Sequence, residues 1–135
     1  MKSLRNIGMI INVLGAVVTF GIMGSTTSPI GSLADLLFTL GFYAWVGLPF
    51  VVLIVLTFYI HRKGLSPAAR VAILLTSILV AASSVLVYWA SIFNSESSTS
   101  ALVFVVIPFY ALIAIAVVYL LAWLVLRLFT TKAKT

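Results

Sequence analysis

The sequence has no cysteine, a single histidine and only two acidic residues in 135 positions. Without cysteine the chain forms no disulfide, thiolate metal site or iron–sulfur cluster. One histidine excludes haem ligation by two histidines of the same chain, and His61 lies in a polar loop, away from hydroxyl groups inside the apolar segments. The two acids, Asp35 and Glu96, are a weak basis for a metal site. We therefore expect no enzymatic activity, no cofactor and no metal site.

Charge is scarce and hydrophobic residues are abundant. Charged residues make up 7% of the chain and hydrophobic residues 64%, whereas soluble domains carry about 25% charged residues. This composition predicts an integral membrane protein surrounded by the lipid bilayer. The net charge of +6 comes from residues that flank apolar runs rather than from a basic stripe with interleaved aromatics, so we expect no nucleic-acid partner.

Four apolar runs are long enough to cross the roughly 30 Å hydrocarbon core of a bilayer as helices. We expect these helices at about residues 7–23, 33–60, 67–93 and 101–126. The first 28 residues also have the layout of a secretory signal, but we interpret them as the first transmembrane helix. The prediction is an all-α integral membrane protein with one domain, residues 1–135, built from two helical hairpins.

The eight basic residues all lie near the two ends of the chain or around the central loop at 61–70, and the two other connecting segments have none. They are Lys2, Arg5, Arg62, Lys63, Arg70, Arg127, Lys132 and Lys134. Because Lys and Arg concentrate in cytoplasmic loops, both termini and the loop at 61–70 are expected in the cytoplasm, with the chain in a bacterial inner membrane. Four of these residues are candidates for contacts with lipid headgroups: Arg62, Lys63, Arg70 and Arg127.

A stripe of small and polar residues runs along the first predicted helix. Gly8, Asn12, Gly15 and Thr19 follow one another at spacings of four, three and four, which places them on one helix face. Small residues let a second backbone approach closely, and Asn12 can form hydrogen bonds across the contact. This face either packs inside the protein, binds another subunit, or lines a polar pathway.

Several residues mark helix ends. Ser32 with Asp35 three residues later is typical of an N-terminal cap, and Ser66 before a proline is another helix start. Tyr88, Trp89 and Phe93 are expected to form an aromatic belt at the outer end of the third predicted helix.

Two prolines fall inside predicted helices, where each removes a backbone donor and favours a kink, at Pro49 and Pro108. An offset of 59 aligns these prolines and the phenylalanine that follows each of them. This match raises the possibility that one hairpin arose by duplication of the other.

Two functions fit these features. The first is a non-enzymatic membrane protein that binds helices of another protein within the bilayer, as an accessory or assembly subunit of a complex or as an immunity-type protein. The alternative is a small transporter or channel that works as a homo-oligomer, with Asn12 on the pathway.

Overall fold

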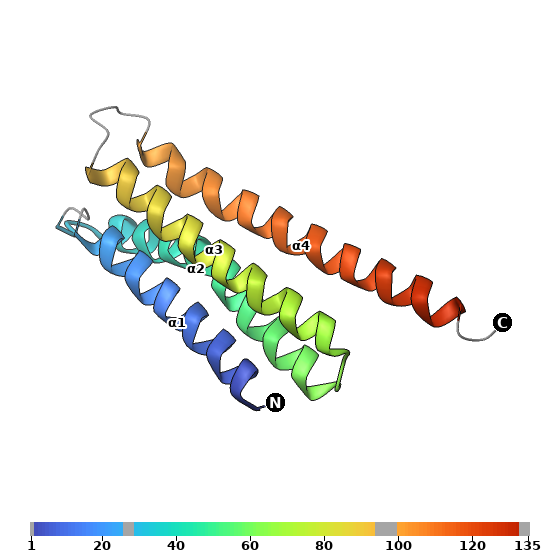
Figure 1. Ribbon diagram of the computed structural model, residues 1–135. Coiled ribbons are helices and arrows are strands. Elements are labelled where there is room, and N and C mark those ends of the chain that lie inside the picture. The colour runs from blue at the N-terminus through green and yellow to red at the C-terminus, as the bar shows by residue number, and fades with distance from the viewer. Residues whose placement is uncertain (1, 26–28, 94–99, 133–135) are drawn as a thin grey trace.

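The computed structural model of the chain describes residues 2–25, 29–93 and 100–132. These residues form four helices: α1 (Lys2–Gly24), α2 (Leu33–Arg62), α3 (Pro67–Phe93) and α4 (Ser100–Lys132) (Figure 1). Each of them contains a stretch that is long and apolar enough to cross a membrane. The chain is therefore all-helical with four candidate membrane spans, as its composition predicted.

Three helices extend beyond the predicted bounds, and α2 ends at Arg62 instead of about residue 60. Helix α1 starts at Lys2 instead of about residue 7, and α4 continues to Lys132 instead of about residue 126. The predictions followed the apolar runs, which mark the part of a helix that fits in hydrocarbon. Backbone hydrogen bonding continues past that boundary into the polar turns, so the helices are longer than the spans.

The four helices are not arranged as equivalent neighbours. Helices α2 and α3 contact each other and both outer helices, whereas the described parts of α1 and α4 make no contact with one another. The start of α1, the α2–α3 turn and the end of α4 lie at one end of the bundle (Figure 1). Gly64 closes this turn with a φ of +64°, a left-handed conformation that glycine adopts without strain.

The interior contains two clusters of buried apolar residues. One lies towards the α2–α3 turn and includes Leu53, Ile73 and Ile115. The other lies towards the opposite end and includes Tyr88, whose ring stacks on Phe104 with centroids 4.6 Å apart. The prediction that Tyr88 belongs to an exposed aromatic belt is thus wrong, because the ring is only 1% exposed and fills the space between α3 and α4.

The aligned residues of α2 and α4 have different surroundings. Pro49 and Pro108 are both buried, but Phe50 is 1% exposed and Phe109 is 55% exposed. A duplication that preserved packing would give these two rings matching environments. If the hairpins share an origin, their packing has diverged.

A hydrogen bond joins α2 to α4 close to the two prolines. Both helices continue through their proline. Because proline has no backbone N–H, the carbonyl oxygens four residues earlier, those of Trp45 in α2 and Phe104 in α4, lack their usual helical donor. Trp45, at that position in α2, donates its indole N–H to the carbonyl oxygen of Val105 at 3.1 Å. This bond fixes the two helices at one depth, and it connects segments 60 residues apart.

Replacing Trp45 with Phe removes this donor while keeping an aromatic ring. We expect Trp45→Phe to lower the free energy of unfolding by about 1 kcal/mol, measured by SDS titration in bicelles, because one interhelical hydrogen bond is lost. Trp89→Phe is the matched control, since Trp89 is more exposed and packs on Phe93 within α3. Equal losses in the two variants would contradict a specific role for the bond to Val105.

Candidate functional site

The stripe predicted on α1 lies inside the protein. Gly8, Asn12, Gly15 and Thr19 are all buried, and we call these four residues the α1 seam. A methyl group added to Gly15 would lie 2.8 Å from the ring of Phe50 and 2.9 Å from a methyl carbon of α3. Side chains of α2 and α3 therefore both lie directly against the backbone of α1 at this glycine.

The contacts along the α1 seam define how the helices run. Gly8 lies beside Thr57 and Gly15 beside Phe50, so α1 is antiparallel to α2. Asn12 contacts Ser77 and Gly15 contacts Ala81, so α1 is parallel to α3. The seam thus packs against two helices at once, and one of them belongs to the other hairpin.

Asn12 forms the polar centre of this contact. Its side-chain N–H donates to Ser77 Oγ at 3.1 Å, and the Ser77 hydroxyl donates to the carbonyl of Ile73 at 2.9 Å. In the described part of the chain, Asn12 Oδ1, Thr19 Oγ1 and Thr57 Oγ1 are buried and have no hydrogen-bond partner. All of these groups are neutral, so they can orient helices or hold a small polar molecule, but they supply no acid–base pair.

His61 is close to this region but bonds within its own helix. Its Nδ1 lies 2.9 Å from the carbonyl oxygen of Thr57, one turn earlier in α2. A carbonyl oxygen only accepts, so Nδ1 carries the proton in this contact, which in the neutral ring leaves Nε2 unprotonated. The described residues include no group of three metal-ligating side chains that would recruit this histidine.

The candidate headgroup residues lie at the end of the bundle that holds the α2–α3 turn. Arg62 and Lys63 are exposed there, and Arg70 is partly exposed in the first turns of α3. Arg127 belongs to α4, but its side chain lies outside the described residues. The three described cations can therefore reach the polar boundary of a bilayer from one side.

The predicted capping residues lie at the starts of α2 and α3. Ser32 Oγ accepts from the backbone N–H of Asp35 at 3.1 Å, and Ser66 Oγ accepts from the backbone N–H of Ala69 at 3.3 Å. Each bond satisfies one of the free donors at a helix N-terminus. These residues therefore have a structural role, and the exposed carboxylate of Asp35 also complements the positive end of the α2 dipole.

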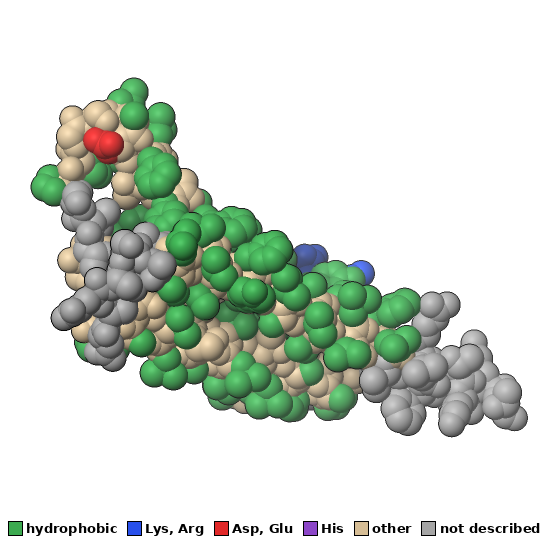
Figure 2. Space-filling model, turned by 90° about the horizontal axis from the view of Figure 1, so that it is seen from above, with side chains coloured by type: hydrophobic (Ala, Val, Ile, Leu, Met, Phe, Trp, Pro, Cys, Tyr) green, Lys and Arg blue, Asp and Glu red, His purple; other side chains and the backbone are tan. Residues whose placement is uncertain are grey.

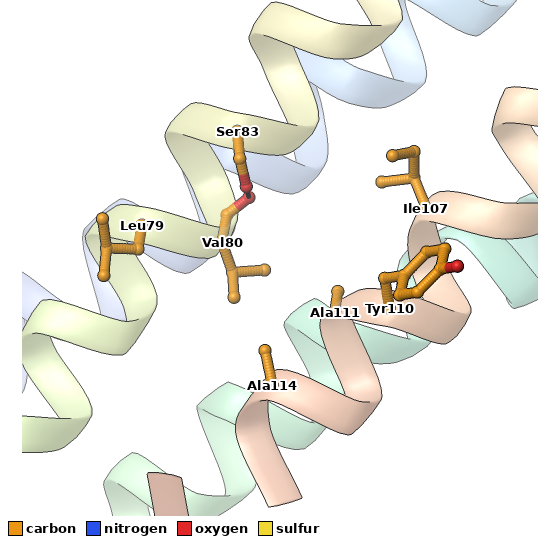
Figure 3. Close-up of a pocket in the computed structure, with 7 residues that line it drawn as sticks. All are labelled: Leu79, Val80, Ser83, Ile107, Tyr110, Ala111 and Ala114. Carbon is orange, nitrogen blue, oxygen red and sulfur yellow. Dashed lines mark hydrogen bonds between the residues drawn. The ribbon is translucent and has the colours of Figure 1, made fainter. Parts of the chain in front are cut away.

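Sequence reasoning missed a groove between α3 and α4. It has a volume of about 300 Å³ and is open to the surroundings (Figure 3). Its lining residues are mostly apolar: Leu79, Val80, Ser83, Ile107, Tyr110, Ala111 and Ala114. The alanines three residues apart on α4 were the signal in the sequence, but they gain meaning only when α3 is placed opposite them.

Comparison with known proteins finds no matching family model, no similar curated protein and no similar solved structure. The function must therefore be argued from the geometry of this chain. That geometry consists of a tightly packed seam with enclosed neutral polar groups, a cationic end, and outward faces made largely of hydrophobic side chains (Figure 2).

Glycine substitutions on α1 separate packing from helix propensity. We expect Gly15→Ala to lower the free energy of unfolding by about 1–3 kcal/mol, because the added methyl overlaps Phe50 and Ala81. Gly21→Ala is the matched control: no atom lies within 4 Å of the added methyl, so helix propensity alone should stabilise the protein by about 0.5–1 kcal/mol. Chemical denaturation in detergent micelles measures both. If the two variants shift stability in the same direction, the seam does not set the distance between the helices.

Proposed function

We propose that this chain is a non-enzymatic membrane protein that acts by binding helices of another membrane protein within the bilayer. It would serve as an accessory or assembly subunit of a complex, or as an immunity-type protein. The described residues offer no reactive pair for catalysis, and the polar groups of the α1 seam are enclosed by the chain's own helices. What remains for recognition is the outer surface.

The observation that carries this proposal is the poor coverage of α4. In its most apolar stretch 17% of the residues are buried, against 39% in α3. From Ala116 to Leu124 none of the residues of α4 is buried, and this half of the helix diverges from α3 (Figure 1). It carries large exposed side chains, including Leu120, Leu121 and Leu124.

Helices in a membrane are held together by close packing rather than by exclusion of water. Between Ala116 and Leu124 the side chains of α4 are exposed or half-buried, so the chain's own helices cover this stretch only in part. Helices of a partner would supply it, and the exposed leucines of this half are suited to interdigitate with a second helix. This part of α4 lies towards the cationic end of the bundle (Figure 1). In the proposed orientation the partner would therefore contact α4 in the cytoplasmic half of the bilayer.

A small homo-oligomeric transporter or channel is the second candidate. It is favoured by one observation, the buried unpaired oxygens of Asn12 and Thr57 beside the glycine-lined seam. If the chain acts only by binding helices, as we mainly propose, it should give no solute flux in proteoliposomes. Flux that Asn12→Leu abolishes, while the protein still inserts and folds, would replace the main proposal with this one.

The proposed orientation has both termini and the α2–α3 turn in the cytoplasm of a bacterial inner membrane. Because the chain has no cysteine, single cysteines can be introduced as unique labels. We expect an impermeant maleimide added to intact spheroplasts to label Ile30→Cys, before α2, and to leave Ala68→Cys unlabelled until the membrane is opened. Both positions are exposed, so the reverse pattern would overturn the orientation.

Extraction of native membranes in mild detergent tests the partner directly. We expect native mass spectrometry to show the chain bound at fixed stoichiometry to another integral membrane protein. Replacing Leu120 and Leu124 together by alanine should weaken this complex about tenfold, because both side chains are exposed on the uncovered half of α4.

The control for this experiment lies on the opposite outer helix. Replacing Leu14 and Val17 of α1 by alanine removes similarly exposed side chains and should leave the complex intact. A chain that is released without any other protein under every mild condition, or a complex equally sensitive to both double variants, would contradict the proposed role of α4.

A further inference from the structure

Two hydroxyl side chains face outwards at the middle of the membrane-spanning region. Ser83 lies ten residues before the end of α3 at Phe93, and Tyr110 lies ten residues after the start of α4 at Ser100. At 1.5 Å per residue each is about 15 Å from the outer end of its helix, which is half of a 30 Å hydrocarbon core. Both side chains are exposed.

These two hydroxyls line the same groove, between α3 and α4 (Figure 3). Small side chains, those of Ala111 and Ala114, line the α4 side, and Val80 faces them from α3. The volume of about 300 Å³ is large enough for an aromatic side chain to enter. Tyr110 stands at the edge, 62% exposed, with its hydroxyl directed away from the alanines (Figure 3).

The two hydroxyl groups can take complementary hydrogen-bonding roles, Ser83 as acceptor and Tyr110 as donor. Ser83 Oγ donates to the carbonyl of Val80 at 3.2 Å, so its oxygen can still accept a hydrogen bond. Tyr110 can donate one, and no hydrogen bond from its hydroxyl is found in the described part of the chain. Hydrocarbon offers neither donor nor acceptor, so an acyl chain in the groove would leave the phenol unpaired.

We propose that the groove between α3 and α4 binds a second copy of this chain, with Tyr110 of each copy seated in the groove of the other and donating its hydroxyl hydrogen to the opposite Ser83. The one-sided distribution of basic residues gives every copy the same orientation. Two parallel copies are related by a two-fold axis along the membrane normal, so residues at the same depth meet. Ser83 and Tyr110 satisfy that condition.

This inference rests on the proposed capacity of the chain to bind helices in the bilayer, but it uses a different surface from the inner half of α4. Loss of the second copy need not release the other membrane protein, and the reverse also holds. The two proposals therefore fail separately.

The test is the association of the purified full-length chain in lipid bilayers. Single-molecule photobleaching over a range of protein-to-lipid ratios gives the dimerisation constant. We expect a dimer, with the constant reduced about three- to tenfold by Tyr110→Phe or by Ser83→Ala, and no further loss in the double variant because the two groups form one bond. Tyr119→Phe, which removes another exposed hydroxyl of α4, should leave the constant unchanged.

A steric pair of variants tests the groove without touching the hydroxyls. Ala114→Trp fills the groove and should abolish the dimer, while circular dichroism and monomer stability stay unchanged because Ala114 is exposed in the single chain. Ala116→Trp adds the same ring to α4 about 200° around the helix and should dimerise normally.

A wild-type chain that stays monomeric at every density would overturn the proposal, as would a dimer that is indifferent to Tyr110→Phe and Ala114→Trp. A third outcome would also overturn the proposal. If the wild-type monomer retains a lipid and the Ala114→Trp variant does not, the groove binds an acyl chain.

Discussion

The close approach of α1, α2 and α3 at Gly15 is the contact on which the rest of the bundle depends. In a bilayer, apolar side chains gain nothing by leaving lipid for protein, so helix association needs dense packing and interhelical hydrogen bonds. Gly15 supplies the first, since its missing side chain leaves room for Phe50 and Ala81. Asn12, one turn away, supplies the second through Ser77. Helix α4 diverges from α3 along a stretch, Ala116 to Leu124, in which every side chain is exposed or half-buried.

The fold class could be predicted because it depends on local properties. The length of an apolar run and the residues at its ends decide whether a helix crosses a membrane, and both can be read without knowing the neighbours. The spacing of the glycines on α1 likewise identified one helix face. Which helices cover that face is not a local property. Ser77 is 65 residues away from Asn12, and nothing in its own surroundings distinguishes it from the adjacent Thr76 or from Ser83.

Residues that look alike in the sequence also differ in the structure. Gly41 and Gly47 lie six residues apart on α2, yet only Gly47 is covered, by the ring of Phe20, while nothing lies within 4 Å of a methyl group at Gly41. Tyr88 and Trp89 are adjacent, but one is buried and the other is exposed. The groove between α3 and α4 could not be predicted at all, because its two walls come from separate helices. For the candidate site, the sequence thus predicted the stripe on α1 but not the residues of α2 and α3 that pack against it.

The bond between Asn12 and Ser77 has a consequence for biogenesis. The first hairpin leaves the ribosome before α3 has been made, so the amide of Asn12 enters the bilayer without the hydroxyl that receives its hydrogen. At about 5–20 residues per second, the intervening 65 residues take roughly 3–13 s to translate. During that interval the nascent hairpin contains an unsatisfied amide in hydrocarbon, and the insertion machinery or a wet defect in the lipid has to shelter it.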